Sequence, residues 1–261
     1  MGHSHSIYVF GSEEFRADQW RLGIYEKIKH YISHGYAVVY VAEEEEADTI
    51  QHFSNLGMPI EDHVQAGSLT IVNRDVFYSP FIPCNVLLEQ WNKLFANIKK
   101  KGASGTYRGF VAIGMPADSF FMSEIDTQQL VKYECAAAEN YDGSIEAMCL
   151  YSSEMIRPMH LGHLILLLNA HQNTAHRNGE LRQWNSRRAL ILIKRGFDAA
   201  LGNNVSGMVL SMILRDFGTN EDALISHPDQ FEKKLQIILG ESGADIAIDC
   251  IKDEIKKDIV Y

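Results

Sequence analysis

The first residues that could carry chemistry follow an apolar segment, IYVF at residues 7–10. A strand, a glycine and a helix start are the setting of a phosphate-binding loop, which needs successive backbone N–H groups and a neutralising lysine. Here Gly11 and Ser12 are followed by Glu13 and Glu14, which would repel a phosphate. The helix N-terminus itself still favours an anion or those glutamates. The stretch therefore has the layout of a nucleotide-binding site but lacks the positive charge that would neutralise a phosphate.

A second acidic pair, Glu43 and Glu44, ends the apolar segment AVVYVA at residues 37–42. This stretch resembles the end of the second strand in RecA/KaiC-like ATPases, where a glutamate is the base for the attacking water. The resemblance implies that role for Glu43 or Glu44. The same residues also suit the acidic first turn of a helix, because the helix dipole is positive there. Both interpretations stay open.

The segment RGFVAIGMPAD resembles the strand that carries the magnesium-supporting aspartate in those ATPases. Here the strand ends in Gly114 and Met115, and Asp118 comes too late to take that position. Without the lysine, the Ser/Thr and this aspartate, neither phosphate neutralisation nor metal holding is provided for. The sequence therefore argues against the usual binding of a nucleoside triphosphate.

Glu134 falls in the middle of an apolar helix face that it shares with Leu130 and Ala137. A carboxylate at a buried position must be paired, hydrogen-bonded or neutral. One interpretation is a structural pair with Arg108 or Arg157. The other is a polar contact at the floor of a ligand pocket.

Histidines gather in HLGHLILLLNAHQNTAH at residues 160–176. His160 and His163 are three apart, but no nearby cysteine or carboxylate completes a zinc set. His171 would lie roughly 16 Å along a continuous helix from His160. The cysteines have no CxxC spacing and predict free thiols in a reducing compartment; they are Cys84, Cys135, Cys149 and Cys250. We expect no metal and no cofactor.

Alternating apolar segments and helical periodicities predict the elements that position these residues. Segments that are apolar throughout indicate strands of a parallel sheet buried on both faces; they span 7–10, 37–42, 68–72, 109–114 and 146–151. Helices are expected between them, the clearest at 84–100, 126–141 and 159–176. Loops that follow parallel strands meet at one edge, where open α/β sheets bind ligands. We expect this edge and the helix bearing Glu134 to supply the ligand-binding residues, namely Gly11, Ser12, Glu13, Glu43, Glu44, Met115, Glu134 and Tyr151.

The alternation ends at HRNGELRQWNSRR, and only helical patterns follow. We therefore expect a three-layer α/β domain at 7–178 and a small all-helical domain at 179–261. MGHSHS, the first six residues, is left out of the expected fold. The basic pairs Arg187-Arg188 and Lys194-Arg195 share one helix face, but acidic residues balance them in this region. A protein partner or a second copy of the chain is favoured there over nucleic acid.

Composition excludes some broad classes. The net charge of −10 argues against general attraction to nucleic acid or anionic lipid. No apolar run, Leu164–Leu168 included, is long enough to span a bilayer. Without an apolar signal segment at the N-terminus, a cytoplasmic protein is expected.

Six segments, taken in order, resemble the methanogen/methylotroph DcmR sensory (MEDS) domain family; they are IYVFGSEEF, ISHGYAVVYVAEEE, VQAGSLTIVNRDVFY, YRGFVAIGM, LVKYECAA and AMCLYSSEM. The resemblance covers about residues 7–176. It implies a RecA/KaiC-like fold without the Walker A motif, used as a sensory module in regulators. Unlike DcmR, the chain has no helix-turn-helix ahead of the domain, so direct operator binding is not expected.

Three functions are compatible with these patterns. The first is a non-enzymatic sensory or regulatory protein that binds a small molecule or protein partner at the carboxyl edge of the sheet and signals through its helical region. The second is a divergent KaiC/RecA-like nucleotide hydrolase with Glu43 or Glu44 as base. The third is an architectural oligomer without a ligand. The missing lysine favours the first and third over the second.

Overall fold

A mainly parallel sheet forms the centre of the protein, whose computed structural model describes residues 4–11, 13, 19–101, 107–140, 145–175, 181–216 and 225–259. The seven strands follow the order β3-β2-β4-β5-β1-β6-β7. All neighbours are parallel except β6 and β7, which are antiparallel. The strands are β1 (Ser4–Phe10), β2 (Ala37–Ala42), β3 (Leu69–Asn73), β4 (Phe110–Gly114), β5 (Ile145–Ser152), β6 (Asn173–Ala175) and β7 (Leu181–Gln183).

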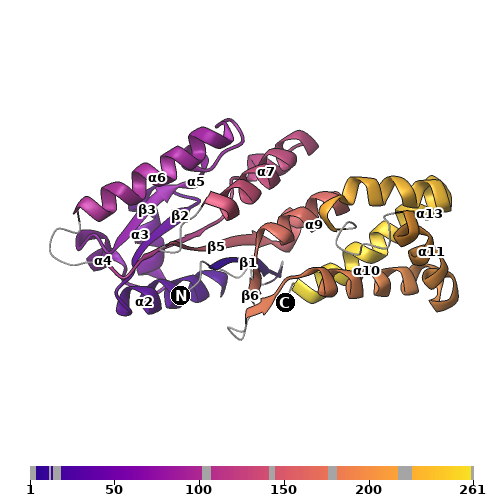
Figure 1. Cartoon of the computed structure of the whole chain (residues 1–261). Coiled ribbons are helices and arrows are strands. Elements are labelled where there is room, and N and C mark those ends of the chain that lie inside the picture. Colours follow the sequence, from indigo (N-terminus) through magenta and orange to yellow (C-terminus); the bar gives the residue numbers. More distant parts are fainter. Residues whose placement is uncertain are drawn as a thin grey trace.

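Helices cover both faces of the sheet, which gives three layers (Figure 1). Val38 and Tyr40 of β2 point into the core on the α2 side, whereas Val39 and Val41 point into the core on the α6 and α7 side. This double burial is why β2 is apolar throughout. The predicted three-layer α/β fold is confirmed. Its helices are α2 (Gln19–Ser33), α3 (Glu46–Asn55), α4 (Glu61–Gln65), α5 (Arg74–Phe77), α6 (Cys84–Lys101), α7 (Glu124–Asn140), α8 (Ser153–Ile156) and α9 (Leu161–Ala170), with the 3₁₀ turn η1 (Asp118–Phe121).

Local sequence signals set these helices. In α6, Leu87, Trp91 and Phe95 form the buried stripe that the helical spacing predicted. The end of α2 is followed by Gly35, whose φ of +83° is the left-handed conformation that commonly stops a helix. Both elements lie where the sequence placed them.

Helices α10 (Ser186–Leu201), α11 (Asn203–Asp216) and α13 (Pro228–Ile259) form the C-terminal region, at one end of the molecule (Figure 1). Helix α13 is interrupted at Gly240, where φ is +72°. Helices α10 and α13 are in close contact at Gly196 and Ile251. Only a glycine fits at position 196, because a Cβ atom there would lie 2.4 Å from the Cα atom of Ile251. The predicted helical C-terminal region is confirmed.

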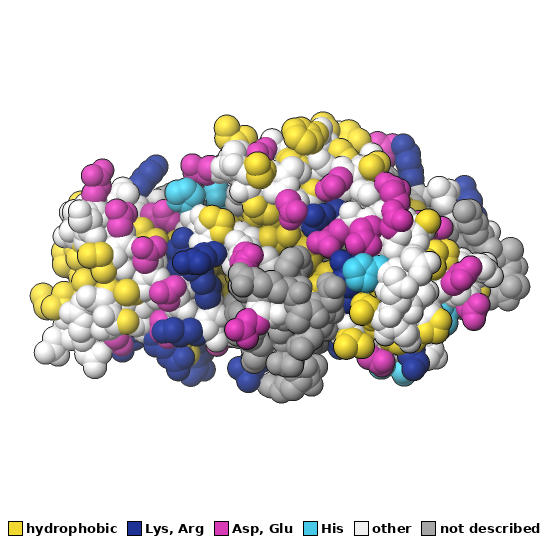
Figure 2. Space-filling view, turned by 180° about the vertical axis from the view of Figure 1, so that it is seen from behind, with side chains coloured by type: hydrophobic (Ala, Val, Ile, Leu, Met, Phe, Trp, Pro, Cys, Tyr) yellow, Lys and Arg dark blue, Asp and Glu magenta, His cyan; other side chains and the backbone are white. Residues whose placement is uncertain are grey.

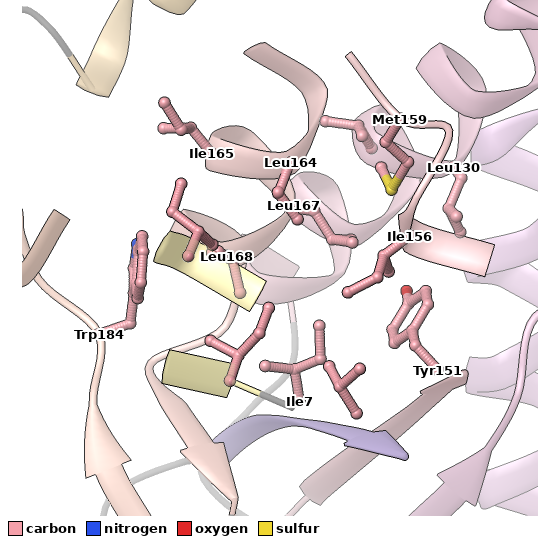
Figure 3. Close-up of a cluster of buried hydrophobic side chains, with 14 of the residues drawn as sticks. Ile7, Leu130, Tyr151, Ile156, Met159, Leu164, Ile165, Leu167, Leu168 and Trp184 are labelled. Carbon is pink, nitrogen blue, oxygen red and sulfur yellow. The ribbon is translucent and has the colours of Figure 1, made fainter. Parts of the chain in front are cut away.

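Helix α9 joins the sheet to this region. Its Leu164 lies in one apolar core with Ile7 of β1 and Trp184, which precedes α10 (Figure 3). At its N-terminus, the backbone N–H of Gly162 donates a 2.7 Å hydrogen bond to Glu232 of α13. The apolar core therefore continues from the sheet into the helical region.

Three expectations need correction. Residues 159–176 are not one helix, because α9 ends at Ala170 and β6 follows. Strands continue beyond the α/β segment, since β7 pairs with β6. The proposed boundary at residue 178 thus falls between two paired strands. The last three residues of MGHSHS also belong to the fold, because β1 begins at Ser4 and its His5 is buried.

The surface carries no simple charge pattern on the face drawn in Figure 2, where acidic, basic and hydrophobic side chains are interspersed. In the C-terminal region, Arg188 bonds Asp258 at 2.5 Å, so the expected basic face loses one of its members to an internal pair. Among the described helices, none combines the length and apolar character needed to cross a membrane.

Candidate functional site

Two polar sites lie on or beside the sheet, and the first is at its carboxyl edge. Here Glu43, just after β2, lies between two arginines. Its carboxylate accepts hydrogen bonds from Arg21 of α2 at 3.1 Å and from Arg74 of α5 at 3.2 Å. Both guanidiniums are largely buried, with 7% and 8% of their side chains exposed. We call these three residues the carboxyl-edge network.

Further contacts extend this network. Arg74 also donates to Asp118 at 2.6 Å and contacts the Met115 sulfur at 3.5 Å. Glu44 lies 3.7 Å from Arg21 and 3.4 Å from His52. Burial raises the pKa of Glu43 above its ordinary value, although both arginines oppose the shift. The two arginines are thus already engaged by carboxylates.

In the predicted loop after β1, the structure describes Gly11 and Glu13 of the predicted site residues. Gly11 is half-buried and Glu13 is exposed. Ser12 lies outside the described residues. Of the residues predicted for the edge, the structure brings together Glu43, Glu44 and Met115.

The second site surrounds Glu134 of α7, in the core on the α6 and α7 side. Glu134 is 1% exposed, which confirms its predicted burial. One carboxylate oxygen, Oε1, accepts hydrogen bonds from the hydroxyls of Tyr78 and, at 3.0 Å, Tyr151. The other, Oε2, lies 3.2 Å from Nε2 of His5 and 3.7 Å from Sγ of Cys149.

His171, at the C-terminal end of α9, completes this second site. Its Nε2 lies 3.6 Å from Oε2 of Glu134, and its Nδ1 lies 2.6 Å from the carbonyl oxygen of Leu167. The His5 and His171 rings are 4.1 Å apart between centroids. Glu134 is therefore surrounded by histidines, tyrosines and a thiol, and the expected arginine partners are wrong.

Burial and hydrogen bonding act against each other on these groups. Burial alone would raise the pKa of Glu134, but the hydrogen bond from His5 and the neighbouring imidazoles lower it to about 2. Burial lowers the pKa of His171 to about 3, because desolvating an imidazolium outweighs its attraction to Glu134. Burial also raises the pKa of the Cys149 thiol well above its ordinary range. At neutral pH the site holds a carboxylate, a neutral His171 and a protonated thiol.

A small cavity lies beside Glu134. Its volume of about 20 Å³ has room for about one water molecule. The lining includes His5, Cys149 and the rings of Tyr78, Tyr133 and Trp91. Glu134 thus lies at the polar wall of a cavity that is far too small for an organic ligand, since ligand pockets occupy roughly 300–1,000 Å³.

Sequence reasoning missed His5, Cys149 and His171. Both His5 and Cys149 sit on strands, and His5 is in register with Ala147, two residues before Cys149. Because strand side chains alternate between faces, this parity places both residues on the side of α7. This alternation could have been recognised in the sequence. His5 was missed because MGHSHS was left out of the expected fold, and His171 was misplaced because the helix was extended to residue 176.

The fold and these sites define a three-layer α/β domain with a helical C-terminal region. The family model of the MEthanogen/methylotroph, DcmR Sensory domain (MEDS) matches residues 4–171, more than half of the chain. The chain therefore belongs to the MEDS family, as its six sequence segments indicated. Its mainly parallel seven-stranded sheet agrees with the three-layer α/β fold class that the resemblance implied.

Solved structures show more distant similarity. The Pyrococcus horikoshii OT3 protein PH0250 matches with a TM-score of 0.43 and 10% identity, over 66% of this chain and 81% of that one. The flagellar accessory protein FlaH from Methanocaldococcus jannaschii matches with a TM-score of 0.39 and 14% identity, over 69% of this chain and 76% of that one. Among curated protein sequences, none matches this chain.

Proposed function

We propose that this chain is a non-enzymatic sensory or regulatory protein that binds a small molecule or protein partner at the carboxyl edge of its sheet. Membership of a sensory-domain family supports the sensory role. The observation that carries the proposal is the position of the Glu43 carboxylate between two arginines. Each of its carboxylate oxygens accepts a hydrogen bond from a different arginine.

This arrangement disfavours nucleotide hydrolysis. A general base must take a proton from water, and each oxygen of Glu43 already accepts a hydrogen bond from an arginine that competes for its electron density. A triphosphate needs cations to neutralise it, but Arg21 and Arg74 already neutralise Glu43. Glu44 is the remaining candidate base, and it too lies within ion-pair distance of Arg21.

The same arrangement suits the reversible binding of a signalling ligand. A ligand with a single anionic group can replace Glu43 between the two guanidiniums, because arginine binds carboxylate and phosphate in a similar geometry. Glu43 would then be released into solvent at the edge. The ligand shifts the protein between these two states only by its different affinity for them.

A route for the output runs through β5 and the helices that follow it. Ser152, the last residue of β5, caps α8 by accepting a hydrogen bond from the backbone of Met155 at 3.1 Å. Helix α9 follows, and its Gly162 bonds to Glu232 of α13. Small displacements at the edge can therefore reach the C-terminal helices through contiguous packed elements.

A thermal-shift screen tests the proposal, because a ligand that binds the folded state raises the melting temperature. The screen contains small organic anions, ATP with magnesium, and ADP. We expect a stabilising anion whose effect is lost in Arg74→Gln and kept in the control Arg108→Gln. The control arginine is exposed and packs against Gly35, away from the network.

Two outcomes would overturn this proposal. A shift with ATP and magnesium that disappears in Glu44→Gln would indicate the nucleotide hydrolase instead. The absence of a shift with any compound would favour an architectural protein without a ligand.

A further inference from the structure

Four potential metal ligands converge beside α7. They are Nε2 of His5, Oε2 of Glu134, Sγ of Cys149 and Nε2 of His171, and all lie within 4.8 Å of one another. We call them the four-donor cluster. We propose that this cluster binds one zinc-class transition-metal ion. The proposal is independent of the carboxyl-edge network, and it replaces the sequence-based expectation of no metal.

The distances suit a tetrahedral ion. Zinc bonds of about 2.0–2.3 Å place neighbouring ligand atoms roughly 3.3–3.8 Å apart. In the cluster, His5 lies 3.2 Å from Glu134 and 3.3 Å from Cys149. Glu134 lies 3.7 Å from Cys149 and 3.6 Å from His171. Four of the six edges of the tetrahedron are therefore near their metal-bound length.

The orientation of His171 points to a cation. Its Nδ1 lies 2.6 Å from the Leu167 carbonyl oxygen, so Nδ1 carries the proton and donates it. In the neutral ring, Nε2 is then a bare acceptor that faces the carboxylate of Glu134, another acceptor. Among the described residues this nitrogen has no hydrogen-bond partner, although His171 is fully buried. A metal ion between the two acceptors would satisfy both.

The surroundings of the cluster match those of known metal sites. A histidine ligand usually donates its other ring N–H to a carbonyl or carboxylate, as His171 does to Leu167. The ligating carboxylate is usually held by further hydrogen bonds, as Glu134 is by Tyr78 and Tyr151. These contacts leave Oε2 of Glu134 directed into the cluster.

The charges also balance. On binding, the Cys149 thiol releases its proton to solvent, and the ring proton of neutral His5 moves from Nε2 to Nδ1, so that Nε2 binds the ion. One thiolate and one carboxylate then neutralise a divalent ion, so the buried site carries no net charge. The mixed nitrogen, sulfur and oxygen donor set favours zinc over magnesium or calcium, which prefer oxygen ligands alone.

The ion would connect parts of the chain that are far apart in sequence. His5 comes from β1, Cys149 from β5, Glu134 from α7 and His171 from the turn between α9 and β6. With four protein ligands the shell is closed, which is typical of structural rather than catalytic zinc. Metal binding would therefore stabilise the packing of α7 and α9 on the sheet.

The test uses the full chain without an affinity tag, refolded with EDTA, then dialysed and refolded again with equimolar Zn²⁺ or Co²⁺. Gel filtration followed by elemental analysis gives the metal retained per chain. We expect about one ion per chain. With Co²⁺ we expect the strong visible absorption of a tetrahedral ion and a thiolate-to-metal charge-transfer band.

Variants locate the site. Cys149→Ser should abolish the charge-transfer band and lower retention at least tenfold, while circular dichroism shows that the protein is folded. Glu134→Gln should also lower retention. The controls are Cys135→Ser, a half-buried thiol next to Glu134 in sequence, and His160→Asn, an exposed histidine; both should retain the ion.

Two results would refute the metal site. One is no retained ion in the folded wild-type chain after loading. The other is retention that Cys149→Ser and Glu134→Gln leave unchanged. Neither result would bear on the anion screen at the carboxyl edge, because the two sites share no residue.

Discussion

Replacing Glu134 with alanine should destabilise the protein far more than the same change at Glu43. Glu134 is 1% exposed, and its loss leaves the buried hydroxyls of Tyr78 and Tyr151 without the acceptor they share. An unsatisfied buried polar group costs about 1–3 kcal/mol, and this change leaves two of them, the hydroxyls of Tyr78 and Tyr151. We therefore expect Glu134→Ala to lower the free energy of unfolding by about 4 kcal/mol.

The Glu43 change should cost much less. Its side chain is 23% exposed, and its partners keep other carboxylates, because Arg74 still bonds Asp118 and Arg21 still lies near Glu44. Exposed or partly exposed ion pairs contribute about 0–1 kcal/mol. We expect a loss of about 1 kcal/mol for Glu43→Ala.

Urea unfolding and thermal melting, both followed by circular dichroism with EDTA present, measure the two variants without any contribution from metal. A loss of 1 kcal/mol lowers the melting temperature by about 2–4 °C in a protein of this size. Glu134→Ala should therefore melt on the order of 10 °C below Glu43→Ala. Equal melting temperatures would refute the reasoning that the buried carboxylate holds its neighbours in place.

Two further predictions concern glycines at close contacts. Gly196→Ala should destabilise the helical region by about 1–3 kcal/mol in urea unfolding, because the new Cβ would lie 2.4 Å from the backbone of Ile251. Gly207→Ala, whose Cβ would meet nothing within 4 Å, should instead stabilise α11 by about 0.5–1 kcal/mol, and a loss in both variants would contradict the contact argument. Gly114→Ala should lower the melting temperature, because its Cβ would lie 2.5 Å from that of Val41. Val41→Ala removes the methyl groups that the new side chain meets. Gly114→Ala should therefore lower the melting temperature less in a Val41→Ala background than in the wild-type chain, and equal losses in both backgrounds would count against this explanation.

The anion screen and the metal-loading experiment complete these predictions. The first addresses Arg74 at the carboxyl edge, and the second addresses Cys149 in the core. Because the sites lie in different parts of the domain, each experiment can fail without the other.

The sequence alone determined most of the fold. Apolar runs such as AVVYVA can be buried on both faces only in a covered, mainly parallel sheet, and β2 spans the predicted residues 37–42. The stripe of α6 likewise follows from the helical period of 3.6 residues. The burial of Glu134 was also readable, because its position on its own helix is a local property.

The partners of Glu134 were decided by the tertiary structure. His5 and His171 are 166 positions apart in the chain, and each meets Glu134 only because β1 lies between β5 and β6 in the sheet. The same holds for Glu43, whose arginines come from α2 and α5. Local periodicity fixes which face a residue occupies, but it carries no information about which distant face lies opposite. That depends on strand order, which is set by the packing of the whole domain.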